Sequence, residues 1–171
     1  FTLLIISSLT LWVVVIYEKT KNQQLNGAFD GLVRNLAAEN FSNNNSIIDQ
    51  NAIVVVIPVF NEEKNIDKVL LELPKECLGI PIVPLVVDDG SQDGTLKKCE
   101  RLGVLTVHNI INRGGGAALR AGYDVALEAS AKVIVTMDGD GQHQPSEIQD
   151  LIMPIINKQA DLVIGSRILG N

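Results

Sequence analysis

Two aspartates separated by a single glycine, Asp138 and Asp140, have the residue types and spacing that most clearly suit chemistry. On a tight loop both carboxylates can reach one hard divalent cation, and Gln142 can add a further oxygen ligand. Mg²⁺ or Mn²⁺ is the natural ion for such a site, where it would neutralise a diphosphate and stabilise it as a leaving group. Arg167 is a candidate for gripping the phosphate oxygens bidentately.

The same aspartates have a plainer interpretation, because an isolated Asp-x-Asp tripeptide is most often a solvated acidic turn. Their position favours a functional site, since they follow a continuous apolar segment at 132–137 that is typical of a strand buried on both faces. Ligands of open parallel sheets bind beyond the carboxyl ends of the strands. The elements around this segment therefore decide where the carboxylates lie.

Alternating strands and helices are predicted from residue 52 onward. Segment 53–57 is a continuous β-branched run, and segment 62–73 carries apolar residues at helical spacing, with Asn61 placed to cap the helix. Further strands are expected at 82–87, 104–107, 132–137 and 161–164, and further helices at 95–102, 117–130 and 148–156, the last kinked by Pro154. This order predicts a doubly wound, mostly parallel α/β sheet with helices on both faces.

Polar residues follow four of the predicted strands, so one rim of the sheet should collect five aspartates and an arginine. These segments are Pro58 to Glu62, Asp88 to Gly94, Asp138 to His143, and Gly165 to Arg167.

Composition narrows the classes of function. The 171 residues are 46% hydrophobic and 20% charged, which suits one globular domain with a short appendage. A net charge of -6 without a cluster of basic residues argues against nucleic acid as a partner. Cys77 and Cys99 lack the spacing of a zinc site or a disulfide framework.

The first 17 residues predict a transmembrane helix that is cut at its N-terminus. Phe1 to Tyr17 carries no charge and would span about 25 Å as a helix, slightly less than a bilayer core of roughly 30 Å. A signal-peptide core or a buried helix are the alternatives. Lys19 and Lys21 place the remainder in the cytoplasm by the positive-inside rule. Residues 18–51 are polar and asparagine-rich, as in a linker, and residues 52–171 form the predicted domain.

Five motifs, in this order and spacing, resemble the family-two glycosyltransferases of GT-A fold: IPVFNEEKNI, VVDDGSQDGT, NRGGGAALRAGYDVA, MDGDGQHQPSEI and DLVIGSR. The resemblance covers about residues 53–171 and is strongest to dolichol-phosphate mannosyltransferase and the polyprenyl-phosphate sugar transferases. It implies that the family's acceptor-proximal segment would follow Asn171, so that the domain here is incomplete at its C-terminus.

The resemblance also implies roles for individual residues. Those bordering the nucleoside and ribose would be Pro58, Phe60, Glu62, Val87 and Asp89. Those at the metal and diphosphate would be Asp138, Gly139, Asp140, Gln142 and Arg167. Gly115 stands where the family often has a lysine, which puts an extra cationic contact in doubt.

The function implied is transfer of a sugar from GDP-mannose or a UDP-sugar to a polyprenyl or dolichyl phosphate, assisted by a metal and inverting at the sugar. A phosphate acceptor is already anionic, and no well-placed general base is identifiable in the sequence. A polysaccharide- or protein-directed transferase of the same fold and a donor-binding but inactive module stay open as alternatives.

Three rival motifs fit less well. Asp89 to Glu100 nearly matches an EF-hand loop, but a β-branched segment containing Pro84 leads into it instead of a helix. The glycines at 114–116 lack the third small residue of a dinucleotide fingerprint, because Leu119 stands there. The Asp138 loop carries Gln142 where haloacid-dehalogenase phosphatases have threonine.

Overall fold

The computed structural model describes residues 48–166 continuously, and in the N-terminal part residues 12–13, 15–21, 23–24, 27 and 31. The chain divides into two compact units, Phe1–Leu36 and Ala37–Asn171. In the first unit the described residues are helical, and their apolar side chains from Trp12 to Tyr17 are at least half exposed. None of the helices in the described parts of the chain combines the length and apolarity that crossing a membrane requires.

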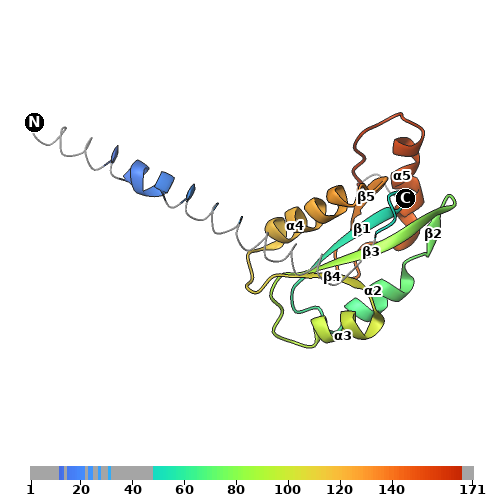
Figure 1. The fold of residues 1–171 in the computed structure, drawn as a ribbon, viewed down its shortest axis with the longest axis horizontal. Helices are drawn as coiled ribbons and strands as arrows, with labels where there is room; N and C mark the ends of the chain where they lie inside the picture. The colour runs from blue at the N-terminus through green and yellow to red at the C-terminus, as the bar shows by residue number, and fades with distance from the viewer. Residues whose placement is uncertain are drawn as a thin grey trace, which may run out of the picture. The chain divides into compact units, whose positions relative to one another are not determined.

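The second unit is built on a mostly parallel sheet (Figure 1). Its parallel strands β4 (Leu105–His108), β3 (Ile80–Asp88), β1 (Ile53–Val59) and β5 (Val133–Thr136) lie side by side in this order. The short strand β2 (Glu76–Cys77) pairs antiparallel with the start of β3. In the register, Ile53 of β1 lies opposite Ile82 of β3 on one side and Val133 of β5 on the other.

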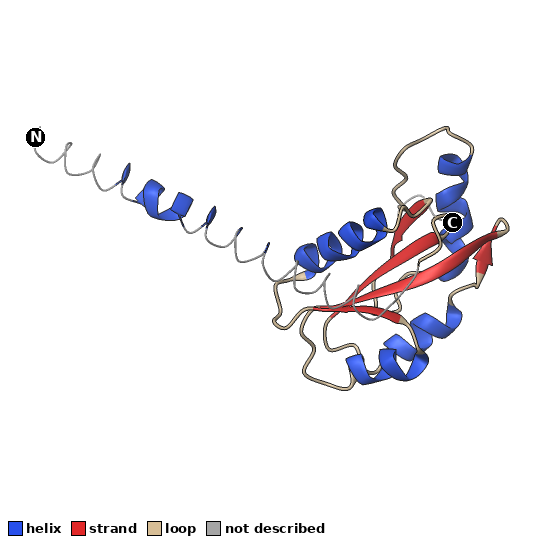
Figure 2. Ribbon diagram, in the orientation of Figure 1, coloured by secondary structure: helices blue, strands red, loops and turns tan. Residues whose placement is uncertain are grey.

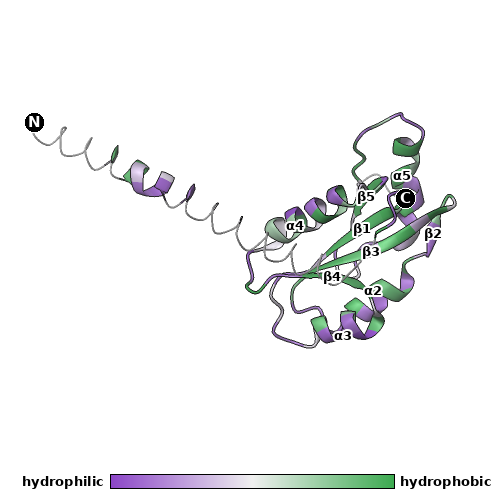
Figure 3. Cartoon of the chain, in the orientation of Figure 1, coloured by the Kyte–Doolittle hydropathy of each residue, from purple (hydrophilic) through white to green (hydrophobic). Residues whose placement is uncertain are grey.

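Helices cover both faces of the sheet (Figure 2). Residues 53, 55, 57 and 59 of β1 point to the face packed by α2 (Ile66–Glu72), α3 (Thr95–Leu102) and α5 (Ile148–Ile156). Residues 54 and 56 point to the opposite face, which packs against α4 (Gly115–Glu128). Because side chains alternate along a strand, this burial of both faces requires the continuous apolar run seen in β1. The central strands β1 and β3 are accordingly mostly hydrophobic, whereas the helices carry mixed surfaces (Figure 3).

The expected α/β fold is confirmed, but two local predictions differ from the structure. Residues 161–166 form no strand, and Leu162 and Ile164 are 75% and 81% exposed, because no neighbouring strand in the described chain pairs with them. Asn61 does not cap a helix: α2 begins at Ile66, with Asn65 in the N-cap position. The helix predicted at 148–156 is confirmed as α5, which follows the 3₁₀ turn η1 (Pro145–Glu147) and includes Pro154.

The predicted transmembrane helix and the predicted linker lie largely outside the described residues. Most of residues 1–17 and all of 32–47 fall outside the described residues, as does Arg167. Ile48, within the segment predicted as linker, is buried in the core beneath α4.

Candidate functional site

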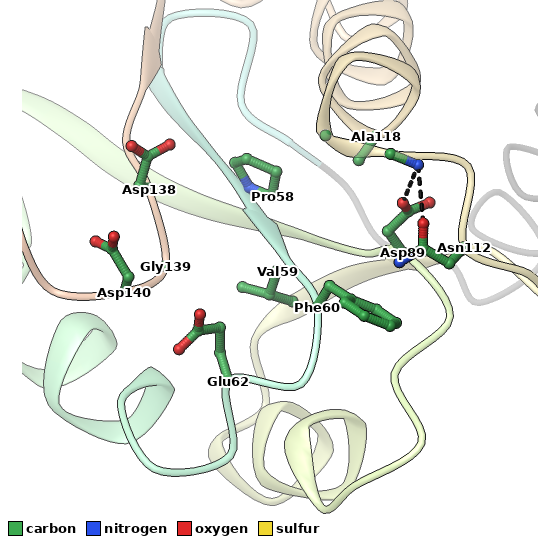
Figure 4. A pocket seen from close by; sticks show the side chains of 12 residues that line it. Pro58, Val59, Phe60, Glu62, Asp89, Asn112, Ala118, Asp138, Gly139 and Asp140 are labelled. Carbon is green, nitrogen blue, oxygen red and sulfur yellow. Dashed lines mark hydrogen bonds between the residues drawn. The ribbon is translucent and has the colours of Figure 1, made fainter.

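A cavity of about 330 Å³ lies at the carboxyl ends of β1, β3 and β5, beside the start of α4. Figure 4 shows Asp138 and Asp140 on the loop after β5, with Glu62 facing them from the loop after β1. The lining residues are Pro58, Val59, Phe60, Glu62, Asp89, Asn112, Gly114, Gly115, Ala118, Asp138, Gly139 and Asp140. Three of the four segments predicted to form the rim therefore contribute to one cavity, and the fourth, Gly165 to Arg167, contributes no described residue to it.

Acidic residues dominate the polar part of this lining. Four of its twelve residues are Asp or Glu, and none of the Lys or Arg residues that the structure describes belongs to it. An anionic ligand such as a diphosphate would meet repulsion in the cavity unless a cation accompanied it. The negative charge of the lining therefore favours an anionic ligand that binds together with a divalent metal ion.

The two aspartates of the Asp138 loop suit such a shared cation. The Asp138 side chain is 52% exposed, so its carboxylate is open to a ligand. One oxygen of Asp140 accepts a hydrogen bond of 2.9 Å from the backbone N–H of Gln142, which leaves its other oxygen for coordination. Within the described chain no group of three or more His, Cys, Asp or Glu side chains forms a metal cage. The donor set fits a metal whose remaining ligands are phosphate oxygens and water.

Gly139 lets the loop approach β1 closely. A Cβ at this position would lie 2.5 Å from Val59 Cγ1 and 3.3 Å from the carbonyl oxygen of Pro58. Any larger residue would therefore push the two aspartates away from the cavity floor.

Asp89 organises the opposite wall of the cavity. Its carboxylate is 2% exposed and accepts hydrogen bonds from Asn109 Nδ2 at 2.9 Å and from the N–H groups of Arg113 and Gly114 at 3.0 and 2.7 Å. Hydrogen bonds to an ionised carboxylate are among the stronger ones in proteins. The side chain of Asp89 thereby fixes the loop that leads into α4, with the first turn of that helix beside the cavity.

A reciprocal set of hydrogen bonds, which we call the clasp, joins residues 61–63 to residues 91–95. Asn61 donates its backbone N–H to Ser91 Oγ at 2.9 Å, and its Oδ1 accepts from the N–H of Gln92 at 2.9 Å. The backbone of Asn61 has φ 57°, a left-handed conformation that asparagine tolerates. The side chain of Asn61 is therefore hydrogen-bonded to the loop that contains Gln92, which explains why it does not cap α2.

The second half of the clasp repeats this arrangement at Glu63. Its backbone N–H donates to Asp93 Oδ2 at 3.1 Å, and its Oε2 accepts from the N–H of Gly94 at 3.2 Å. A Cβ on Gly94 would lie 2.6 Å from Glu63 Cδ, so the contact needs a glycine there. Phe60 and Glu62 alternate with the clasp residues and line the cavity, so the clasp holds both of them in place.

Asp93 is held in its charged form. Burial raises its pKa, but hydrogen bonds from the side chain and backbone of Thr95 and from the backbone of Glu63 outweigh this, and the pKa of the carboxyl lies below its ordinary value.

The residues predicted for the site are distributed unevenly. Seven of them line the cavity: Pro58, Phe60, Glu62, Asp89, Asp138, Gly139 and Asp140. Val87 is fully buried in the core beneath α4 and does not line it. Gln142 is exposed, and its backbone N–H donates to Oδ1 of Asp140.

Histidines do not contribute a base to the described lining of the cavity. His108 ends strand β4. Its Nδ1 lies 2.7 Å from Oδ2 of Asp88, which is fully buried. His143 lies on the loop after β5, where its Nδ1 contacts the backbone N–H of Asp138. Sequence patterns carried no signal for that contact, because it depends on how the loop folds back.

Residues 54–171 match the family model described as glycosyl transferase family 2. The UDP-N-acetylglucosamine–dolichyl-phosphate N-acetylglucosaminyltransferase of Methanococcus voltae is 36% identical over 133 residues, covering 68% of this chain and 52% of that protein. The polyprenol monophosphomannose synthase of Mycolicibacterium smegmatis is 38% identical over 120 residues, covering 67% of this chain and 44% of that protein.

The fold also matches a solved structure. Residues 1–349 of TarS from S. aureus superpose with a TM-score of 0.51 at 24% identity, covering 64% of this chain and 34% of that one. This similarity concerns the fold alone. The chain spans about half the length of the curated relatives it matches.

Proposed function

Because this chain belongs to glycosyl transferase family 2, we propose that the protein transfers a sugar from a nucleotide-sugar donor to a polyprenyl or dolichyl phosphate. The donor would be GDP-mannose or a UDP-sugar, and the sugar carbon would be inverted. The observation that carries this proposal is the acidic cavity at the strand ends, lined by Asp138 and Asp140.

Donor binding would divide the cavity between its two sides. The nucleoside would lie against Pro58 and Phe60, because Phe60 lines the cavity, is 43% exposed and has a ring that suits stacking on a base. The diphosphate would lie toward Asp138 and Asp140, which would hold Mg²⁺ or Mn²⁺ together with it. When bound, the metal would supply charge neutralisation of the leaving diphosphate. Arg167 would add a phosphate contact, as the family resemblance implies.

The acceptor follows from the chemistry that the cavity offers. An acceptor phosphate oxygen can attack the sugar carbon directly while the nucleoside diphosphate leaves from the opposite side. This step needs no proton removal, because a phosphate is already anionic at neutral pH. A hydroxyl acceptor would need a base, for which the described lining offers only its carboxylates, and two of these would be occupied by the metal. The names of the two relatives, which contain dolichyl phosphate and polyprenol, support the same acceptor class.

A lipid acceptor requires the domain to work at a membrane. We propose that residues 1–17 anchor the protein and that the catalytic domain is cytoplasmic, on the charge pattern of Lys19 and Lys21. Ile110 and Ile111 add apolar surface near the cavity, since they are 66% and 42% exposed and directly precede the lining residue Asn112.

Donor binding is tested by titrating the full chain in detergent with GDP-mannose and UDP-sugars, with and without Mn²⁺. We expect Mn²⁺-dependent binding of one donor that Asp140→Asn weakens tenfold or more, since this substitution removes a charged ligand without changing size. Asp150→Asn, on the exposed side of α5, is the matched control and should leave binding unchanged. Metal-independent binding that is unaffected by Asp140→Asn would refute the assignment.

Transfer is tested by supplying membranes that contain the protein with radiolabelled sugar nucleotides. Label should appear in an acid-labile lipid that partitions into organic solvent. Label found only in polysaccharide or protein, after short incubation and with lipid turnover blocked, would favour another acceptor. Donor binding without transfer to any acceptor would favour an inactive module.

A further inference from the structure

The loop that carries both cavity aspartates is closed by a single side chain. The backbone N–H of Asp138 points at Nδ1 of His143, five residues later, at a distance of 3.0 Å. Between them Gly141 has φ 79°, which turns the chain back on itself. The loop therefore begins and ends at the same hydrogen bond.

This contact determines the tautomer of His143. A backbone N–H can only donate, so Nδ1 must accept and the ring proton must lie on Nε2. The alternative contact, between Nδ1 and Asp138 Oδ2, is 3.7 Å long and too far for a hydrogen bond. His143 thus contacts the main chain of Asp138 and leaves the carboxylate of that residue open to a ligand.

The rest of the loop is fixed from other directions. Gly139 rests against the end of β1, and Asp140 accepts the N–H of Gln142. The imidazole of His143 holds the main chain of Asp138. The spacing between the carboxylates of Asp138 and Asp140 therefore depends on that ring.

We propose that His143 is a positioning residue, which holds the main chain of Asp138 so that Asp138 and Asp140 present their carboxylates to one shared cation. This inference rests on the proposed function, because the cation is the one that would accompany the donor diphosphate. Partners of this kind, which orient a ligand without touching the metal, typically account for about 10–100-fold in metal affinity.

The structure suggests a geometric test with three substitutions. His143→Asn places an amide oxygen near the position of Nδ1, His143→Gln places its amide near the position of Nε2, and His143→Ala removes both. Mn²⁺ affinity of the full chain in detergent, with saturating nucleoside diphosphate, is measured from the electron paramagnetic resonance signal of free Mn²⁺. We expect His143→Ala and His143→Gln to lower this affinity about tenfold, and His143→Asn to restore most of it.

The controls separate positioning from folding. Gln144→Ala alters the exposed neighbour, whose side chain makes no capping hydrogen bond, and should bind Mn²⁺ as the wild type does. Thermal unfolding without metal establishes that each variant is folded. In the wild type, long-range ¹H–¹⁵N correlation spectra should show the proton of His143 on Nε2, a readout that needs neither metal nor a variant.

Each failure has a distinct meaning. Equal Mn²⁺ affinity in wild type and a folded His143→Ala, or a proton on Nδ1, would overturn the positioning role. A wild type that shows no Mn²⁺-dependent nucleotide binding, whatever the tautomer, would instead count against the proposed function and remove the cation on which this role depends.

Discussion

At the scale of single residues, Asp93 illustrates how a side chain remote from ligand chemistry can support a site. It accepts hydrogen bonds from Thr95 and Glu63, and the neighbouring Glu62 lines the cavity. The carboxyl is more acidic in the folded protein than in the unfolded chain, because these hydrogen bonds favour its charged form.

Asp93 should therefore make stability depend on pH. A lowered pKa contributes stability above the unfolded value of about 3.9, and that contribution is lost as the pH falls through the folded value. We expect the wild type to be more stable than Asp93→Asn at pH 7 and the gap to narrow below about pH 4. Urea unfolding across this range measures the gap, and a gap that is constant with pH would contradict the prediction.

Thr95 provides the matched comparison. Thr95→Ser keeps the hydroxyl that bonds Asp93, and Thr95→Val removes it at similar volume. The serine variant should keep the pH dependence of the wild type, and the valine variant should lose part of it.

At this scale, the sequence was sufficient to predict cavity residues whose role depends on residue type. It was not sufficient to predict contacts that depend on how the chain folds back on itself. Asp138, Asp140 and Glu62 follow strands directly, so their convergence at one cavity could be anticipated. The contact of His143 with Asp138 depends on the turn at Gly141, which no periodicity reveals. Val87 belongs to a strand whose two faces are both buried, and its side chain packs beneath α4 rather than at the cavity.

At the scale of elements, α4 sits close to the sheet because of one glycine. A Cβ on Gly122 would lie 2.9 Å from Val87 Cγ2 and closer still to Val56 Cγ1. The helix that brings Gly114 and Gly115 to the cavity is therefore seated by the absence of a side chain in its middle.

Gly122→Ala should destabilise the protein by about 1–3 kcal/mol, the usual cost of overpacking a core. Gly116→Ala lies in the same helix with nothing within 4 Å of its added Cβ, and should be neutral or stabilising by up to about 1 kcal/mol. Urea unfolding compares the two variants. Equal stabilisation of the two variants would mean that helix propensity rather than packing controls α4.

Strand and helix order could be predicted from the sequence because each β-α unit carries its own periodicity. The segment 161–164 has the composition of a strand, yet a strand also needs a partner, and in the described structure that segment is irregular. Composition alone does not supply the partner.

At the scale of the whole molecule, the proposed lipid acceptor makes a demand on the surface near the cavity. Ile110 and Ile111 are exposed on a loop whose base is pinned, because Asn109 donates its N–H to the Asp88 carbonyl and its Nδ2 to Asp89. Two isoleucines held outward in this way suit contact with an acyl or prenyl surface.

Replacing both isoleucines with serine should impair transfer to a long-chain acceptor in vesicles several-fold, because the apolar contact is lost. Transfer to a short-chain, water-dispersed prenyl phosphate should be little changed. Leu71→Ser on α2, at a position 74% exposed, serves as the control for general loss of surface hydrophobicity. Equal loss with both acceptors would place the effect in the cavity and contradict a membrane role.

The clasp has a consequence for how such a domain can be altered by evolution or by design. Residues 61–63 and 91–95 are thirty positions apart, yet each supplies both a donor and an acceptor to the other. A chimera that takes one of these loops from a relative would keep only one partner of each hydrogen bond in the clasp. We therefore regard the two loops as a single transferable module. Moving both loops together would exchange the preference for a sugar nucleotide, and moving either loop alone would lose it.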